Sequence, residues 1–237
     1  MNPRWGCIFM PFTALATLAA VAALALALAG QAPSSLEGVL RALDAAAPGI
    51  HSVSAKITLN DYTALVHSND RSSGMLYFEH QGNRISYSLD LTRPRNAARR
   101  LMVVNGFGWY YVPSAKQVTK RALGANQDLL QYLLVGMGAT GADLNRLFAI
   151  TFDGPVQFGK ADAVKLTLVP RDPKASATYP KIELWLNPGT WLPAAEQLWQ
   201  QGGDYHLLVY SETKLNRKLD PKIFSTDFPG ATVVVQN

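Results

Sequence analysis

The chain has 237 residues, of which 48% are hydrophobic and 16% are charged, and 22 Lys and Arg against 17 Asp and Glu give a net charge of +5. This length is enough for one sizeable hydrophobic core, and the mild basic charge, with no aromatic residues interleaved among the clustered arginines, argues against nucleic-acid binding. The only cysteine is Cys7, so the rest of the chain offers neither a disulfide nor a thiol nucleophile.

The first 29 residues have the layout of a secretory signal peptide. A short basic start precedes an apolar run over 15–29, and Ala27-Leu28-Ala29 has the small-x-small form that signal peptidase cuts. The run is short and alanine-rich for a membrane-spanning helix. We therefore expect residues 1–29 to be removed on export and residues 30–237 to form a single domain. An uncleaved N-terminal anchor is the alternative, whereas a lipid anchor is not expected because Cys7 precedes the apolar run.

A helix is predicted at the start of the mature chain. Ser34 and Glu37 have the spacing of a capping box, and Pro48-Gly49 ends the helix. Apolar residues at helical spacing share one face: Leu36, Val39, Leu40, Leu43 and Ala47.

Strands dominate the rest of the chain. Apolar and polar residues alternate over 53–59 and 85–92, which is typical of strands with one buried face. Further strands are predicted at 164–168, 182–186, 205–209 and 233–235. Pairs suited to tight turns lie between such runs: Gly82-Asn83, Asn105-Gly106 and Gly202-Gly203. Because no βαβ alternation is present, we expect an α+β fold built on one curved antiparallel sheet.

One segment interrupts the strands with closely spaced apolar residues. Asn126 is suited to cap one predicted helix, and a second helical segment is predicted over 143–148. The apolar residues of the two segments are Leu129, Leu130, Leu133, Leu134, Met137, Leu144, Leu147 and Phe148. Glycines at 136, 138 and 141 make the connection easy to bend. We expect these helices to lie on the apolar face of the sheet.

The sequence contains no recognisable catalytic or metal-binding motif. Its four histidines have no metal-ligand spacing, and it contains no His-Glu-x-x-His, no Gly-x-Ser-x-Gly and no phosphate-binding glycine loop. We expect no enzyme activity, no metal and no cofactor. Acidic residues that converge only in the fold are the alternative that the sequence leaves open.

Aromatic residues are concentrated in the predicted strands: Tyr77, Phe78, Tyr87, Trp109, Tyr110, Tyr111, Trp185, Trp199, Tyr205 and Tyr210. A strongly curved sheet covered by short helices can enclose a hollow, and aromatic and branched side chains would then line a pocket for an acyl chain. A buried methylene contributes about 0.8 kcal/mol, so a fully sheltered chain of about 15 would contribute on the order of 12 kcal/mol. Ordinary core packing is the alternative for each side chain.

The one dense basic cluster spans 93–100 and contains four arginines. We expect Arg95, Arg99 and Arg100 to contact anionic head groups or an acidic partner. A solvated loop is the alternative.

Four parts of the chain resemble the LolA family, the periplasmic carrier proteins for outer-membrane lipoproteins. Three of them are NGFGWYYVP at 105–113 with Gln117-Val118, YPKIELWLNPGTWLP at 179–193, and the ending from Leu215-Asn216 through Asp220 and Phe224 to FPGA at 228–231. Gly203-Asp204-Tyr205, leading to Tyr210, belongs to the same pattern. The resemblance covers essentially the whole mature chain in the same order.

The resemblance implies an open half-barrel of about eleven antiparallel strands, with about three helices as a lid over a hydrophobic cavity. It also implies a monomeric periplasmic carrier that binds the acyl chains of lipoproteins. Such a carrier receives them from an inner-membrane lipoprotein-releasing transporter and passes them to an outer-membrane acceptor. The lid maps onto 126–137, 143–148 and the first helix, with Leu129, Leu130, Leu133, Leu134, Leu144 and Leu147 as its apolar contacts. The expected cavity residues are Tyr77, Tyr87, Leu89, Val103, Trp109, Leu166 and Leu184.

One departure from the family concerns the lid. The carriers have an Arg-Pro pair just after the strand that corresponds to 74–78, whereas this chain reads EHQGNR at 79–84. Arg84 is the nearest candidate for a residue that latches the lid. The same half-barrel also occurs in a lipid-anchored receptor and in periplasmic regulators that bind an anti-sigma factor. A regulatory or lipid-sensing binding module is therefore the alternative function.

Overall fold

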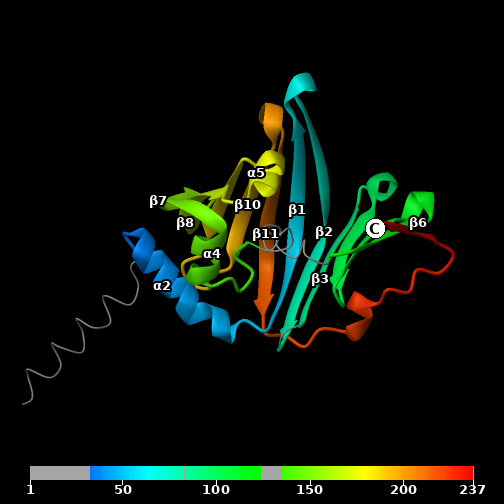
Figure 1. The fold of residues 1–237 in the computed structure, drawn as a ribbon, viewed down its shortest axis with the longest axis horizontal. Coiled ribbons are helices and arrows are strands. Elements are labelled where there is room, and N and C mark those ends of the chain that lie inside the picture. The colour runs from blue at the N-terminus through cyan, green and yellow to red at the C-terminus, as the bar shows by residue number, and fades with distance from the viewer. Residues whose placement is uncertain (1–32, 83, 124–134, 237) are drawn as a thin grey trace, which may run out of the picture. The chain divides into compact units, whose positions relative to one another are not determined.

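Twelve strands form one sheet in the computed structural model, which describes residues 33–82, 84–123 and 135–236 (Figure 1). The strands are β1 (Ser52–Thr63), β2 (Ser68–Gln81), β3 (Arg84–Arg93), β4 (Arg99–Val104), β5 (Phe107–Val112), β6 (Gln117–Ala122), β7 (Phe148–Phe158), β8 (Ala161–Pro170), β9 (Lys181–Leu186), β10 (Pro193–Trp199), β11 (Tyr205–Leu215) and β12 (Thr232–Gln236). The predicted signal peptide, residues 1–29, lies outside the described residues.

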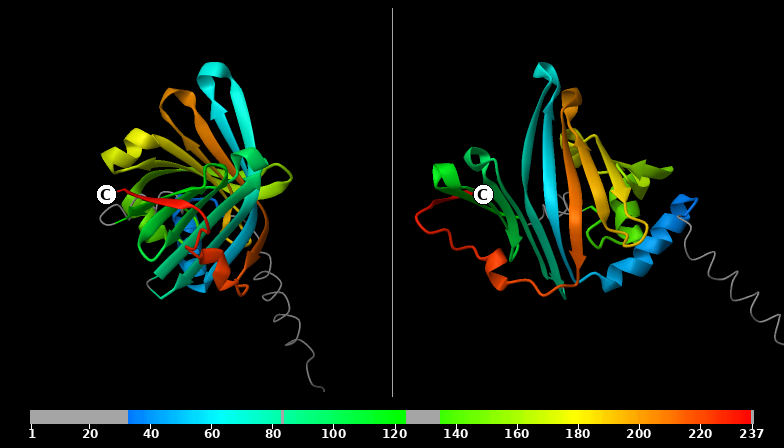
Figure 2. Two further views of the ribbon diagram at one scale, coloured as in Figure 1. Left: turned by 90° about the vertical axis from the view of Figure 1, so that its right-hand side faces the viewer. Right: turned by 180° about the vertical axis from the view of Figure 1, so that it is seen from behind.

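Two meanders meet in the middle of this sheet. The spatial order is β12-β6-β5-β4-β3-β2-β1-β11-β10-β9-β8-β7, so the chain runs outward from β1 to β6 and later returns from β7 to β11. Neighbouring strands are antiparallel except β12, which lies parallel to β6. With β7 and β12 at opposite ends, the sheet is open (Figure 2). The predicted curved antiparallel half-barrel is confirmed, with twelve strands instead of about eleven.

Strand register defines one apolar face, which we call the inner face. Leu59 on β1 pairs with Leu208 on β11, and Leu89 on β3 pairs with Leu101 on β4. Leu184 on β9 faces the same way, because Glu196 on β10 pairs with both Leu184 and Leu208. Since side chains alternate along a strand, these five leucines identify the residues of the same phase on every strand.

Three α-helices occur within the described ranges: α2 (Leu36–Ala46), α4 (Gly141–Leu147) and α5 (Pro173–Thr178). The N-cap of α2 is Ser35, whose Oγ accepts a hydrogen bond from the Gly38 amide at 3.2 Å. The prediction of Ser34 as the cap was therefore wrong by one residue. α4 begins with a capping box between Thr140 and Asp143, because each side chain accepts from the other residue's backbone amide. α5 was not predicted, because its six residues have no apolar periodicity.

α2 and α4 pack closely against each other. The Gly141 amide donates to Asp44 Oδ1 at 2.8 Å, and a Cβ atom at Gly141 would lie only 2.7 Å from the Leu40 carbonyl oxygen. The glycine thus permits a contact that any side chain would block. In Figure 1 both helices lie beside the half of the sheet that contains β7 to β10.

Candidate functional site

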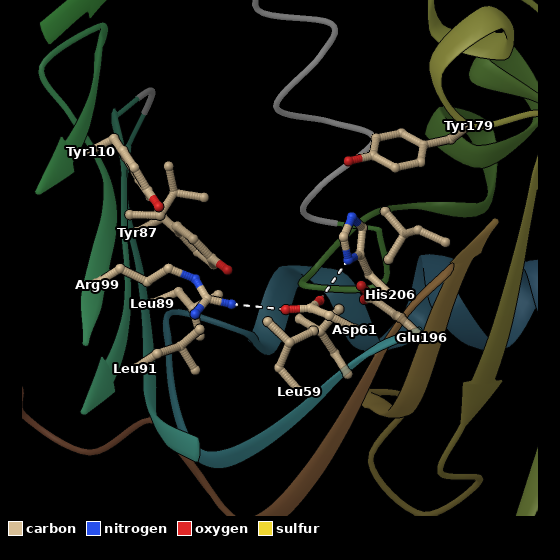
Figure 3. A pocket seen from close by; sticks show the side chains of 13 residues that line it. Leu59, Asp61, Tyr87, Leu89, Leu91, Arg99, Tyr110, Tyr179, Glu196 and His206 are labelled. Atoms are coloured by element: carbon tan, nitrogen blue, oxygen red, sulfur yellow. Dashed lines mark hydrogen bonds and ion pairs between the residues drawn. The ribbon is translucent and has the colours of Figure 1, made fainter. Parts of the chain in front are cut away.

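The principal candidate site is a pocket of about 240 Å³ on the inner face (Figure 3). Six leucines from β1, β3, β4, β10 and β11 make up its apolar wall: Leu59, Leu89, Leu91, Leu101, Leu198 and Leu208. Its polar lining consists of Asp61, Tyr87, Arg99, Tyr110, Tyr179, Glu196 and His206. Because β1 and β11 join the two meanders, both halves of the sheet contribute to one pocket.

A chain of charged and polar groups crosses this pocket. Asp61 Oδ2 accepts a hydrogen bond from Arg99 Nη2 at 3.0 Å, and Asp61 Oδ1 lies 2.6 Å from His206 Nδ1. The other ring nitrogen of His206 is 2.8 Å from Gln200 Nε2, and Arg99 Nη1 donates to Ser72 Oγ at 3.3 Å. Figure 3 shows Arg99 and His206 approaching Asp61 from opposite sides. The Asp61 carboxylate thus ties β4 to β11 across the sheet.

Glu196 is the buried acid of the pocket, with 1% of its surface exposed. Burial raises the pKa of its carboxyl well above the ordinary value, which outweighs the opposing effect of a hydrogen bond from the Tyr210 hydroxyl. The Glu196 carboxyl therefore keeps its proton to a higher pH than an exposed glutamate does. Burial also raises the pKa values of Tyr87 and Tyr210, so both keep their hydroxyl protons.

A second, polar pocket of about 520 Å³ adjoins the first and shares Asp61, Arg99 and Tyr110 with it. Its other lining residues are Asp70, Arg71, Ser72, Pro94, Asn96, Ala97, Ala98 and Val112. An apolar pocket thus continues into a polar one that has two arginines in its wall.

A third pocket, of about 190 Å³, lies between α4 and the β2–β3 hairpin. Its lining includes Leu144 and Leu147 from α4, together with Phe78, His80 and Ile85 from the hairpin. The two α4 leucines predicted as lid contacts are buried against the sheet here. The other four, Leu129, Leu130, Leu133 and Leu134, lie outside the described residues.

The structure separates the predicted cavity residues into three groups. Tyr87 and Leu89 line the principal pocket. Val103, Leu166 and Leu184 point to the inner face but are buried in the packed core around it.

Trp109 and Tyr77, the third group, were assigned to the wrong face. Trp109 pairs with Met102 and packs against Phe228, with the ring centres 6.1 Å apart, whereas its neighbour Tyr110 lines the pocket. Tyr77 likewise lies between Leu76 and Phe78, which belong to the inner core. Both stretches are apolar in both phases, so alternation alone does not reveal which phase faces inward.

The predicted contact arginines also differ in position. Arg99 lines both the apolar and the polar pocket. Arg100 pairs with Asp90 on the other face, and Arg95 lies exposed in a short 3-10 helix beside the polar pocket. Arg84 is exposed at the start of β3, and its side chain makes no hydrogen bond or ion pair with the part of the chain that is described, so its role as a latch stays a prediction.

Three polar members of the site, Asp61, Glu196 and His206, were missed at the level of sequence. Asp61, Glu196 and His206 come from separate strands, and only their pairing brings them together. One signal was present for Glu196, an acid in the same alternating phase as Leu198.

Within residues 33–82, 84–123 and 135–236, no three His, Cys, Asp or Glu side chains are grouped to hold a metal ion. None of the helices in these ranges has the length and apolar character to cross a membrane.

Comparison with known proteins shows a likeness at the level of the fold. No family model and no curated protein matches the chain. The structure matches MucB with a TM-score of 0.52 at 15% identity, over 84% of this chain and 65% of that chain. The fold is similar to that of MucB. The chain thus spans just under two thirds of the MucB chain.

Two further solved structures match over most of their length. An uncharacterized conserved protein from Thermus thermophilus has a TM-score of 0.51 at 11% identity, over 84% of this chain and 98% of that chain. The LolA superfamily protein NE2245 from Nitrosomonas europaea has a TM-score of 0.40 at 18% identity, over 83% and 100%.

Proposed function

We propose that this protein is a lipid-binding module of the bacterial envelope that holds an acyl chain in its leucine-lined pocket. The observation that supports this most directly is the junction between the two inner pockets. One is walled by six leucines, and the other is polar and shares Arg99 with it. An amphiphile has the same order of parts, an apolar chain followed by a polar head.

The size of the pocket limits what it encloses. At about 240 Å³ it is smaller than the roughly 300–1,000 Å³ typical of sites that enclose a whole small ligand. We therefore expect it to hold part of one acyl chain.

We extend the proposal to a carrier role in the periplasm, in which the ligand is the acylated end of a lipoprotein. The support for this step is the resemblance of four sequence segments to the LolA family and the signal-like N-terminus. In this role the protein takes lipoproteins from an inner-membrane transporter and delivers them to an outer-membrane acceptor.

Filling the pocket tests the binding site. Leu101→Trp and Leu208→Trp would each occupy space that the acyl chain needs. If about three methylenes are excluded at about 0.8 kcal/mol each, binding weakens by roughly 50-fold. The measurement is titration with cis-parinaric acid, a fluorescent fatty acid. Leu65→Trp is the control, because Leu65 is 90% exposed and does not line the pocket. Equal affinity in the filled variants and the control would show that this pocket is not the lipid site.

The carrier role is tested separately. The mature protein would be isolated from a Gram-negative periplasm and analysed by native mass spectrometry and lipid extraction. A co-purified lipoprotein or diacyl lipid, displaced by the fatty-acid probe and reduced in Leu101→Trp, is the expected result. A protein free of lipid that also fails to bind the probe would favour a regulatory module that binds a protein partner.

A further inference from the structure

The buried acid Glu196 is an unusual wall residue for an apolar pocket. It lies on β10, where its strand partners are Leu184 on β9 and Leu208 on β11. Its side chain points toward the interior of the pocket in Figure 3. A leucine at this position would complete the apolar wall, so the carboxyl group calls for a separate explanation.

The hydrogen bonds of this carboxyl group are incomplete. The Tyr210 hydroxyl donates to it, but its Oε1 atom is buried and has no hydrogen-bond partner among the described residues. An uncharged carboxyl has one O–H donor besides its acceptor sites. A proton carried on Oε1 has no acceptor among the described residues, and leaving a buried donor without an acceptor is costly in an apolar site.

We propose that the Glu196 carboxyl group recognises the acyl carbonyl of the bound lipid by donating a hydrogen bond to its oxygen. This proposal rests on the lipid-binding function proposed above and specifies the ligand class as acyl chains joined through an ester or amide. The carbonyl oxygen is the acceptor nearest the apolar chain in such a lipid. It would therefore reach Glu196 while the head group stays near Arg99 in the adjoining polar pocket.

Two lipids that differ only in the carbonyl group test whether Glu196 recognises it. 1-Palmitoyl-lysophosphatidylcholine carries an ester carbonyl, and 1-O-hexadecyl-lysophosphocholine has the same head group and chain length with a methylene in its place. We expect the wild-type protein to bind the ester about fivefold to tenfold more tightly, as measured by calorimetric titration. An amide-linked N-palmitoyl amphiphile, compared with its N-hexadecyl counterpart, distinguishes an amide source from an ester source.

Two variants identify the recognising group. Glu196→Leu removes the donor, so the ester and the ether should bind equally, with the ether bound at least as tightly as in the wild type. Glu196→Gln keeps an N–H donor and should keep the preference. The carbonyl stretching band of ¹³C-labelled ester lipid gives a second readout: a shift to lower frequency in the wild type and in Glu196→Gln, and none in Glu196→Leu.

Equal binding of both lipids by the wild type would overturn the proposal, even if Glu196→Leu does not fold. A preference that survives in Glu196→Leu would also overturn it. If the wild type binds neither lipid, the lipid-binding function itself fails. That result is distinct from loss of carbonyl selectivity in a protein that still binds the ether.

Discussion

Glu196→Gln is expected to gain stability relative to the wild type as the pH rises from 5 to 8. The pKa of Glu196 in the folded protein lies well above its ordinary value of 4.5, because the carboxyl is buried. Above pH 4.5 the unfolded chain loses this proton while the folded protein keeps it, so the wild type loses stability as the pH rises toward the folded-state pKa. The loss approaches about 1.4 kcal/mol per pH unit for as long as the folded carboxyl stays protonated. Glutamine does not titrate, so Glu196→Gln avoids this loss of stability.

The measurement is urea unfolding of both proteins at pH 5, 6, 7 and 8. Glu183→Gln is the control with the opposite sign. Burial acts to raise the pKa of Glu183, but hydrogen bonds from Lys165 and Trp199 and the charges of Lys165 and Lys181 outweigh it, so the pKa is lowered. Its stabilising effect is present above pH 4.5 and is lost as the pH falls below that value. The free energy of unfolding of Glu183→Gln should therefore lie below that of the wild type by a constant amount between pH 5 and 8. If the difference in the free energy of unfolding between Glu196→Gln and the wild type is also constant over this range, Glu196 is ionised in the folded protein.

Gly74→Ala is expected to destabilise the protein by about 3 kcal/mol, the upper end of the range for overpacking. Gly74 pairs with Leu91 beside a bulge between β2 and β3, and a Cβ atom there would lie 1.8 Å from the Asp90 carbonyl oxygen. The clash is with backbone, so β3 itself has to move. For a chain of this size the melting temperature should fall by roughly 6–12 °C.

Thermal unfolding followed by circular dichroism measures this effect. Gly49→Ala is the matched control, because a Cβ atom at Gly49 meets nothing within 4 Å. Leu91 lines the pocket, so Gly74→Ala should also weaken acyl-chain binding. A melting temperature equal to that of the control would show that β2 and β3 separate at little cost.

The accuracy of the sequence-based predictions depended on how clearly each strand marks its two faces. In β3, the polar Ser86, Ser88 and Asp90 leave only one phase for Tyr87 and Leu89, and both were placed correctly in the pocket. In β5 the residues from Phe107 to Val112 are apolar or glycine in both phases, and the prediction selected Trp109 where Tyr110 faces the pocket.

The polar centre of the site was beyond prediction for a different reason. Asp61 is 38 residues from Arg99 and 145 residues from His206 along the chain. Each lies in a strand whose local pattern is ordinary, and their contact depends on the pairing of β1 with β11 and on the reach of an arginine across β2 and β3. A single sequence carries the alternation of each strand but not the order in which the strands lie side by side.

The pairing of β1 with β11 also has a consequence for how this protein matures. Val53 pairs with Leu215, so the seam between the two meanders closes only after β11 has been synthesised. Closing so long a loop is entropically costly and slows folding. During synthesis, the leucines of β1, β3 and β4 therefore remain exposed until β10 and β11 emerge. We expect the incomplete protein to need protection from aggregation at this stage, and to acquire affinity for an acyl chain only when its last long strand is in place.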